Sequence, residues 1–194
     1  MTFDIIFAGV GGQGVLSMAA IIGRAALSEG LHAKQSEVHG MAQRGGAVQA
    51  HLRLSDRTIE SDLIPIGMAN LILSLEPVES LRYLEQLSPS GTLVTAAKPF
   101  VNIPDYPDVE GVLAKVRSLP HAIVVDAEKL AMEAGDVQTL NTVMVGAVVR
   151  LLPLRVETIE KAVAATFASK GDAVIKANLA ALRAGGQAAA CAAP

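Results

Sequence analysis

Aromatic residues are scarce in this chain. Tryptophan is absent, and aromatic residues make up only 3% of the 194 residues. Proteins that bind single-stranded nucleic acid stack the bases on aromatic side chains, and little of that material is present here. The net charge of -3 also gives no strong positive field that would attract a phosphate backbone. We therefore expect no nucleic acid among the partners of this chain.

Cysteine is almost as rare. The one cysteine, Cys191, lies in an Ala- and Gly-rich segment near the end of the chain. A single thiol excludes a disulfide within the chain, and it cannot supply the ligands of an iron–sulfur cluster or a cysteine-rich zinc site. His39 has no cysteine or second histidine at metal-ligand spacing either. We expect no metal site built by this chain alone.

Long hydrophobic runs are also missing. The most apolar stretch, residues 137–152, contains Gln138, Asn141 and Arg150 and is shorter than the roughly 20 residues that a membrane-spanning helix requires. The first residues lack the basic start and the cleavage site of a secretory signal. Since 51% of the residues are hydrophobic and 18% are charged, the composition is typical of a globular domain. We therefore expect a cytoplasmic protein that does not bind a membrane.

Apolar runs that alternate with helical patterns predict an α/β fold. The expected strands are residues 3–8, 32–38, 69–75, 91–95 and 121–125, and the expected helices are residues 15–27, 76–86, 108–118 and 126–134. Residues 46–54 alternate between apolar and polar side chains, and a turn at Ser55-Asp56 predicts an antiparallel hairpin with residues 57–61. The expected architecture is a Rossmann-like three-layer sandwich with a mostly parallel sheet, an antiparallel hairpin and a helical C-terminal third.

The last third of the chain has helical patterns only. Residues 137–152 are apolar on nearly all sides, which predicts a buried helix that Pro153 ends. A helix over 156–168 follows, and another begins at Gly171-Asp172 and stops at Gly185-Gly186. We expect residues 1–186 to form one domain and residues 187–194 to form a disordered tail.

A glycine cluster follows the first expected strand. The residues Gly9-Val10-Gly11-Gly12-Gln13-Gly14 satisfy GxGxxG, and such glycines allow a tight turn and leave the N–H groups at the start of a helix open to a phosphate. Glu37 lies 23 residues after Gly14, about where a dinucleotide fold places its ribose-binding acid. The alternative interpretation is tight packing of strand against helix, and the motif alone does not decide between them.

A second polar segment spans residues 36–46, with the sequence SEVHGMAQRGG. It lies between two expected strands, so we expect a loop, and loops at the carboxyl end of a parallel sheet are where α/β folds bind ligands. Arg44 and the glycines after it could bind a phosphate or carboxylate. Arg44 could equally bond a carbonyl group or pair with Glu37. His39 could carry a proton, but a structural role is the simpler interpretation.

Complete catalytic machinery is not recognisable. The sequence contains neither GxSxG nor HExxH. Ser17 follows the glycine cluster as a P-loop serine would, but the lysine of that motif is missing, which argues against hydrolysis of a nucleoside triphosphate. The catalytic residues therefore stay unassigned.

Two long motifs resemble a known family. GVGGQGVL at 9–16 and SEVHGMAQRGGAVQAHLR at 36–53 resemble the γ domain of 2-oxoacid:ferredoxin oxidoreductases. EVHGMAQRGG is most similar to the β subunit of the indolepyruvate type. The resemblance continues in order through Asp62-Leu63 and the segments listed here: ANLILSLEPVES (69–80), VDAEKLAMEAG (125–135), NTVMVGAVVRLLPL (141–154) and KANLAALRAG (176–185). It covers nearly the whole chain.

The resemblance implies a subunit that works with a larger partner. In that family, thiamine diphosphate and the iron–sulfur clusters belong to other domains or subunits, and the enzyme converts a 2-oxoacid to acyl-CoA, CO2 and reduced ferredoxin. The resemblance implies that the substrate is indolepyruvate or another arylpyruvate and that the chain is inactive alone. It also implies that coenzyme A, as co-substrate, lies near the glycine-rich loop. The candidate cofactor-binding residues are Gly11, Gly12, Gln13, Gly14, Ser36, Arg44, Gly45 and Gly46.

Three hypotheses follow from these features. The first is the oxidoreductase subunit, whose partners are the larger thiamine and Fe-S subunit and, through the complex, ferredoxin. The second is a free-standing NAD-binding oxidoreductase, which would bind a nucleotide without a partner. The third is a non-catalytic assembly domain of the same family, which would form the complex but would not be needed for turnover. An isolated subunit also leaves an apolar surface uncovered, through which it could form a homodimer.

Overall fold

A computed structural model describes residues 1–39, 45–101 and 103–192 of the chain. Its strands are β1 (Thr2–Val10), β2 (His32–His39), β3 (Ala47–Ser55), β4 (Ala69–Ser74), β5 (Leu87–Ala96) and β6 (Ala122–Val125). Its α-helices are α1 (Val15–Ser28), α2 (Pro77–Arg82), α3 (Val109–Arg117), α4 (Ala127–Glu133), α5 (Leu140–Val148), α6 (Val156–Thr166) and α7 (Asp172–Ala192). Short 3-10 helices are η1 (Leu84–Gln86), η2 (Val137–Thr139) and η3 (Ala168–Lys170).

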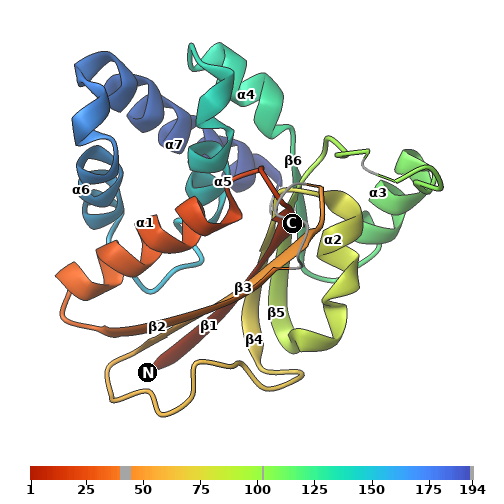
Figure 1. Cartoon of the computed structure of the whole chain (residues 1–194), viewed down its shortest axis with the longest axis horizontal. Helices are drawn as coiled ribbons and strands as arrows, with labels where there is room; N and C mark the ends of the chain where they lie inside the picture. The colour runs from red at the N-terminus through yellow and green to blue at the C-terminus, as the bar shows by residue number, and fades with distance from the viewer. Residues whose placement is uncertain (40–44, 102, 193–194) are drawn as a thin grey trace.

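The strands form one sheet in the order β2-β3-β1-β4-β5-β6. Strands β1, β4, β5 and β6 pair in parallel, whereas β3 pairs antiparallel with both β1 and β2. Helices cover both faces of the sheet (Figure 1). The expected three-layer α/β sandwich is confirmed, and its sheet is mixed.

Strand β1 lies inside the sheet and is buried on both faces. Every residue from Asp4 to Val10 is buried. Ile5 and Phe7 belong to the larger hydrophobic core, and Ile6 belongs to the smaller one. A strand covered on both faces is a nearly continuous apolar run, which is why residues 3–8 could be recognised from the sequence. The glycine cluster that follows is thereby held at a rigid strand end.

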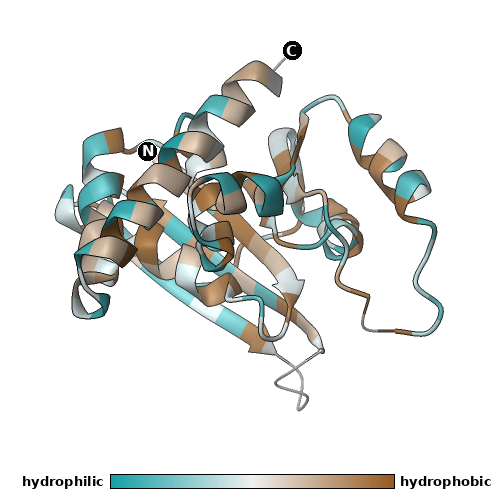
Figure 2. Ribbon diagram, turned by 90° about the horizontal axis from the view of Figure 1, so that it is seen from above, coloured by the Kyte–Doolittle hydropathy of each residue, from teal (hydrophilic) through white to brown (hydrophobic). Residues whose placement is uncertain are grey.

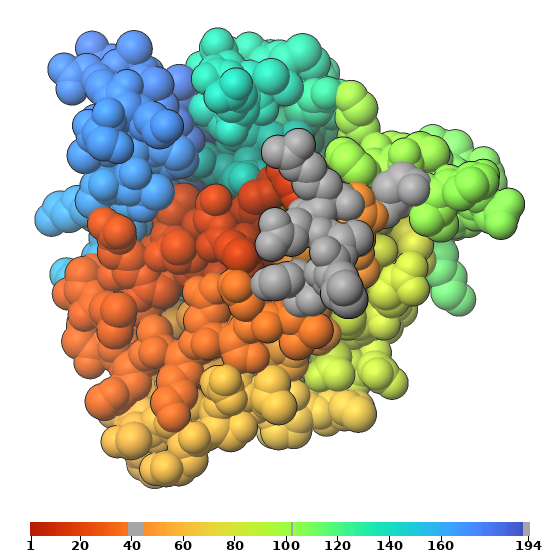
Figure 3. Space-filling view, viewed as in Figure 1, coloured from red at the N-terminus to blue at the C-terminus, as the bar shows by residue number. Residues whose placement is uncertain are grey.

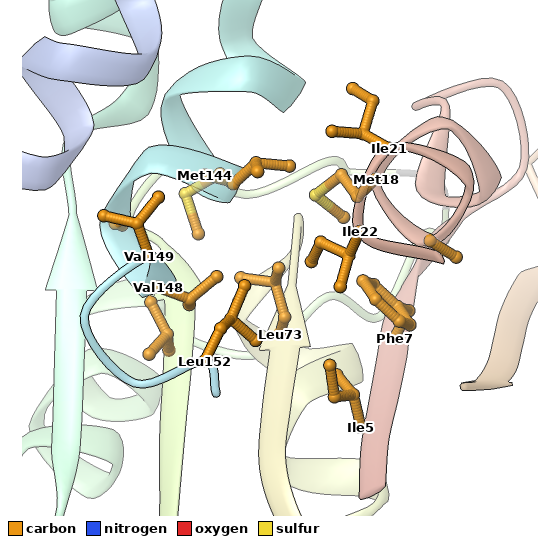
Figure 4. Packing of buried hydrophobic residues seen from close by; sticks show 14 of the residues in the cluster. Ile5, Phe7, Met18, Ile21, Ile22, Leu73, Met144, Val148, Val149 and Leu152 are labelled. Atoms are coloured by element: carbon orange, nitrogen blue, oxygen red, sulfur yellow. The ribbon is translucent and has the colours of Figure 1, made fainter. Parts of the chain in front are cut away.

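The two cores differ in size. The larger one lies between the sheet and the layer of α1, α4, α5, α6 and α7. In Figure 4, Met18 and Ile22 of α1 and Met144 of α5 lie above Phe7 of β1 and Leu73 of β4. The smaller core joins the opposite face to α2, η1 and α3. The helices are mixed in hydropathy in Figure 2, as expected for helices that cover a sheet with one face.

The expected hairpin is only partly correct. Residues 46–54 do form a strand, β3, but residues 57–61 do not return as its partner, because β3 pairs with β2 on one side and with β1 on the other. Residues after β3 form a loop whose backbone is bonded by side chains. Arg53 Nη1 donates to the carbonyl oxygens of Ser61 at 3.2 Å and Leu63 at 3.1 Å. The N–H of Ile64 donates to His51 Nδ1 at 3.0 Å.

Two helix boundaries also differ from the expectation. The apolar stretch 137–152 is η2 followed by α5, which ends at Val148, before Pro153. Helix α7 does not stop at Gly185-Gly186 but continues to Ala192, so residues 187–192 are helical and not a disordered tail. The glycines are needed for contact between helices. An ideal Cβ on Gly185 would lie 1.9 Å from the Val143 carbonyl oxygen, and one on Gly146 would lie 2.0 Å from that of Leu182.

Within the described part of the chain, no helix combines the length and the apolar character that crossing a bilayer would require.

The close contact of α5 with α7 predicts that alanine at two adjacent glycines of α7 has unequal effects on stability. We expect Gly185→Ala to lower the free energy of unfolding by about 3 kcal/mol, because its methyl group has no room against α5. Gly186→Ala is the control. Its Cβ would lie 3.5 Å from the nearest atom, which is ordinary contact, and alanine is favoured in a helix by roughly 0.5–1 kcal/mol. Urea denaturation of both variants measures the difference, and equal stabilities would contradict the close approach of α5 and α7.

The bond from Ile64 to His51 predicts a dependence of stability on pH. Burial lowers the pKa of His51 from 6.5, an effect that the nearby charge of Asp62 opposes. Because the folded pKa lies below the unfolded one, the stability present above 6.5 is lost as the pH falls through the folded value. His51→Asn keeps an acceptor atom near the position of Nδ1 but does not titrate. We expect urea midpoints of the wild type and this variant to diverge between pH 7.5 and pH 5.5. A difference between the two urea midpoints that stays constant with pH would show that titration of His51 does not cause this loss of stability.

Candidate functional site

The candidate site lies where two neighbouring parallel strands, β1 and β4, end. After β1 the chain enters α1 on the face of the larger core, and after β4 it enters α2 on the opposite face. Loops that leave adjacent strands toward opposite faces open a crevice at the carboxyl edge of the sheet, and α/β proteins bind ligands there. The glycine-rich loop, Gly11–Gly14, forms one side of this crevice.

The two glycine motifs of the sequence meet at this edge. The Gly11 N–H donates to the Gly46 carbonyl oxygen at 2.8 Å, and the Gly45 N–H donates to the Gly11 carbonyl oxygen at 3.1 Å. These bonds continue the antiparallel ladder in which Val10 lies opposite Ala47. Gly45 has a φ of 78°, in the left-handed region that favours glycine. The chain therefore enters β3 directly beside the point where it leaves β1.

Gly14 begins helix α1 in contact with α5. Its φ is 81°, and no side chain caps the helix. The Asn141 side chain donates from Nδ2 to the Gly14 carbonyl oxygen at 3.3 Å, and an ideal Cβ on Gly14 would lie 2.3 Å from that nitrogen. Glycine is therefore required at this position both by backbone conformation and by the asparagine.

Gln13 connects the ends of β1 and β4. The Val10 N–H donates to its Oε1 at 2.7 Å, and its Nε2 donates to the Leu75 carbonyl oxygen at 3.2 Å. Both ends of the amide are used inside the protein. Gln13 thus shapes the loop and fixes it to the residue that follows β4.

A first hollow of ≈ 300 Å³ lies against the glycine-rich loop. It is lined by Val10, Gly11, Gly12, Gly14, Val15, Leu16 and Val48. The N–H groups of Gly12, Val15 and Leu16 donate to no other described residue. Open N–H groups at the start of a 14-residue helix attract an anion, because they also lie at the positive end of the helix dipole. The hollow is thus suited to a phosphate that is attached to an apolar group.

A second hollow of ≈ 190 Å³ lies on the other side of Gln13. It is lined by Gln13, Leu75, Ala96, Lys98, Pro99, Phe100, Ala127, Glu128 and Leu140. Most of these side chains are apolar. Lys98 Nζ forms an ion pair with Glu128 Oε1 at 2.5 Å, and the lysine side chain is 61% exposed. Residues after Phe100 run into the green segment that projects from the body of the molecule in Figure 3.

Two buried acidic residues follow Leu75, which lines this second hollow. Glu76 directly precedes α2 and Glu79 lies within it, and both are buried. Burial raises the pKa of Glu79, although the guanidinium of Arg82, whose Nε lies 3.2 Å from Glu79 Oε2, opposes this. Tyr106 donates its hydroxyl hydrogen to Glu76 Oε1. Burial, followed by this hydrogen bond, raises the pKa of Tyr106, so its hydroxyl keeps the proton at neutral pH.

The candidate residues of the sequence fall into three groups. Gly11–Gly14 and Gly45-Gly46 come together as described. Ser36 lies within β2 opposite His51, so the segment from residue 36 is not a loop at its start, and Ser36 lines neither hollow. Arg44 lies outside the described residues.

The strand order does not fit the dinucleotide-binding interpretation. In a dinucleotide fold, the strand that carries the ribose-binding acid lies next to the first strand. Here β3 lies between β1 and β2, so Glu37 is two strand spacings, about 10 Å, from β1. Glu37 therefore does not occupy the ribose-binding position.

Sequence reasoning missed three residues of this region, Asn141, Glu76 and Tyr106. Asn141 carried a signal, because it is one of the few polar residues in a largely apolar helical stretch, where a buried polar side chain needs a partner. Glu76 and Tyr106 are 30 residues apart, and no spacing rule connects them. Among the described residues, no three His, Cys, Asp or Glu side chains are grouped as metal ligands.

Comparison with known proteins gives a consistent result along the chain. The family model for pyruvate ferredoxin/flavodoxin oxidoreductase matches residues 4–188. Indolepyruvate oxidoreductase subunit IorB of Archaeoglobus fulgidus is 36% identical over 194 residues, which cover 95% of this chain and 94% of that protein.

Two solved structures have the same fold. Pyruvate oxidoreductase subunit PORC of Thermotoga maritima superposes with a TM-score of 0.74 at 28% identity, covering 96% of each chain. The 2-oxoglutarate:ferredoxin oxidoreductase of Magnetococcus marinus, solved with 2-oxoglutarate, coenzyme A and succinyl-CoA, gives a TM-score of 0.76 at 20% identity. The match covers 98% of this chain but only 31% of that longer one.

The contact between Gly14 and Asn141 predicts that alanine at Gly14 lowers stability more than alanine at Gly30, a glycine of equal φ. Gly14 and Gly30 both have a φ of 81°, but an ideal Cβ on Gly30 meets nothing within 4 Å. We expect Gly30→Ala to lower the free energy of unfolding by about 1–2 kcal/mol, the cost of the left-handed conformation. Gly14→Ala adds a clash with the Asn141 side chain, so it should lower the free energy of unfolding by more than Gly30→Ala does. Combining it with Asn141→Ala should remove the excess, as urea denaturation would measure. Equal costs for both single variants would contradict the contact.

Proposed function

This chain belongs to the pyruvate ferredoxin/flavodoxin oxidoreductase family and is a small subunit of a 2-oxoacid:ferredoxin oxidoreductase, and we propose that it holds coenzyme A for a larger partner subunit. The observation that carries this proposal is the first hollow, where open N–H groups of Gly12, Val15 and Leu16 line a partly apolar crevice. Coenzyme A combines phosphates with an apolar arm, which is the combination that such a crevice accommodates.

Charge and backbone support the phosphate contact. Gly12 is exposed, so a phosphate can approach its backbone without meeting a side chain. Arg44 directly precedes Gly45, whose backbone is bonded to Gly11. A guanidinium forms strong, charge-assisted hydrogen bonds to phosphate. We therefore propose that Arg44 and the N–H groups of the glycine-rich loop bind the phosphates together.

The remaining chemistry is proposed to belong to the partner. Thiamine diphosphate would supply the group on which the 2-oxoacid loses CO2, and the Fe-S clusters would carry the two electrons to ferredoxin. Cys191 alone cannot ligate a cluster, which supports this division. A longer related chain, of which this one corresponds to 31%, supports a partner of larger size. The task of this chain is then to bind coenzyme A and direct its thiol toward the acyl group.

The substrate proposal follows the similar proteins. Indolepyruvate oxidoreductase subunits are among the relatives, so we propose an arylpyruvate such as indolepyruvate as the 2-oxoacid. The pocket for its side chain would lie mainly in the partner. We also propose a cytoplasmic location, where ferredoxin accepts the electrons. The competing function is a non-catalytic assembly domain, which would form the same complex without being needed for turnover.

An anaerobic pull-down from the source cells tests the assembly. The tagged chain should retain a larger brown protein that contains thiamine diphosphate, detected by mass spectrometry and visible absorbance. The complex should oxidise an arylpyruvate with ferredoxin and coenzyme A, and removing this chain should abolish acyl-CoA formation. Full turnover without it would support the assembly domain. A colourless chain recovered alone, as monomer or homodimer, would contradict the subunit function.

The phosphate contact is tested by Arg44→Ala in the assembled complex. Loss of a charge-assisted bond to a phosphate should raise the KM for coenzyme A about tenfold and leave the KM for the 2-oxoacid unchanged. Arg57→Ala is the control, because Arg57 is exposed beyond the end of β3, at the opposite edge of the sheet. An unchanged KM for coenzyme A in Arg44→Ala would refute the contact.

A further inference from the structure

Hydrogen bonds connect the glycine-rich loop to the turn after β4. Gln13 donates to the Leu75 carbonyl oxygen, and the Leu75 N–H donates to the Ala8 carbonyl oxygen of β1 at 3.0 Å. The next residue, Glu76, is held in turn by Ser74, whose Oγ accepts from the Glu76 N–H at 3.1 Å. The backbone at Glu76 is therefore held close to the glycine-rich loop.

Glu76 uses both carboxylate oxygens behind the site. Its Oε2 accepts from the Glu79 N–H at 2.8 Å and so caps α2, while its Oε1 accepts from the hydroxyl of Tyr106. Only 1% of Glu76 is exposed. A carboxylate so far from water is costly unless its oxygens are bonded, and no cation in the described part of the chain forms an ion pair with it. Capping α2 would not require Tyr106.

Tyr106 lies on the connection between β5 and α3. The start of the same connection, Lys98-Pro99-Phe100, lines the second hollow together with Gln13 and Leu75. Phe100 is 41% exposed and Val101 is 67% exposed, so the core does not hold this segment by burying its apolar side chains. The bond from Tyr106 to Glu76 connects the far end of the segment to the turn after β4. Gln13 is hydrogen-bonded to the same turn, at Leu75.

We propose that Glu76 and Tyr106 are positioning residues, which hold the β5–α3 connection as the outer wall of the second hollow. This inference rests on the proposed binding of coenzyme A at the glycine-rich loop. The second hollow adjoins that loop through Gln13 and is mostly apolar, so it takes the uncharged part of the same ligand. Neither Glu76 nor Tyr106 touches the ligand. They act through Lys98, Pro99 and Phe100.

The experiment compares Tyr106→Phe with Tyr83→Phe in the assembled complex. Both tyrosines are half-buried, and burial raises the pKa of each hydroxyl. Tyr83 packs against the smaller core, and its hydroxyl bonds no other described residue. Both variants thus lose one hydroxyl, but only Tyr106→Phe removes the bond to Glu76. The measurements are the KM for coenzyme A, kcat, and amide hydrogen exchange in peptides that contain residues 97–101.

In Tyr106→Phe, we expect faster exchange in these peptides and a KM for coenzyme A raised roughly tenfold, with kcat within about twofold of the wild type. Tyr83→Phe should change neither. Unchanged exchange in Tyr106→Phe would show that the hydroxyl does not hold the connection. Faster exchange with an unchanged KM would show that the connection does not form part of the site. Either result overturns the proposal.

Failure of the proposal can be separated from failure of the proposed function. If Arg44→Ala raises the KM for coenzyme A but Tyr106→Phe does not, the ligand binds at the glycine-rich loop and the positioning role is wrong. If neither variant changes that KM, the coenzyme A site itself is wrong. Glu76→Gln provides a conservative check. Its amide oxygen can still accept a hydrogen bond from the hydroxyl of Tyr106. This variant should therefore raise the KM for coenzyme A less than Tyr106→Phe does.

Discussion

The antiparallel pairing of β3 with β1 determines where the site can form. Because the two strands run in opposite directions, the residues that enter β3 lie beside the residues that leave β1, and the ladder extends past Val10 and Ala47 to join Gly11 with Gly45 and Gly46. The same insertion separates β2 from β1, which moves Glu37 away from the ribose-binding position of a dinucleotide fold. One strand pairing thus creates the double-glycine edge and removes the nucleotide specificity that the first motif alone would suggest.

The sequence could predict elements whose signals are local. Strand β1 is an apolar run that ends in glycines, and α1 begins where the expected helix begins, so both were correct. Strand partners are not a local property. The alternation in residues 46–54 predicted a strand correctly but not its neighbours, because Arg53 and His51 bond the following backbone and keep it as a loop. The candidate site was predictable as two glycine motifs, whereas the bond from Tyr106 to Glu76 joins distant residues without any pattern.

Glycine has two different uses here, and only one can be recognised from the sequence. Gly14 and Gly45 adopt positive φ at turns, as the GxGxxG and RGG motifs indicate. Gly146 and Gly185 lie within helices, although a helix end was expected at Gly185. They permit two backbones to touch, and a carbonyl oxygen of the partner helix occupies the space that a Cβ would need. The meaning of a glycine in a helical pattern therefore depends on the helix that faces it.

The polar groups of the site are arranged for binding more than for reaction. Both ends of the Gln13 amide are used by the backbone, and Asn141 is bonded to Gly14. Glu76 accepts hydrogen bonds from Tyr106 and from the Glu79 N–H of α2. Among the described residues, the polar groups that stay open toward the first hollow are backbone N–H groups, which can hold an anion but cannot transfer protons or electrons at neutral pH. The described side chains of this site therefore serve mainly to shape a crevice that can hold a ligand. This agrees with the relatives in the family, which are named as subunits of oxidoreductases.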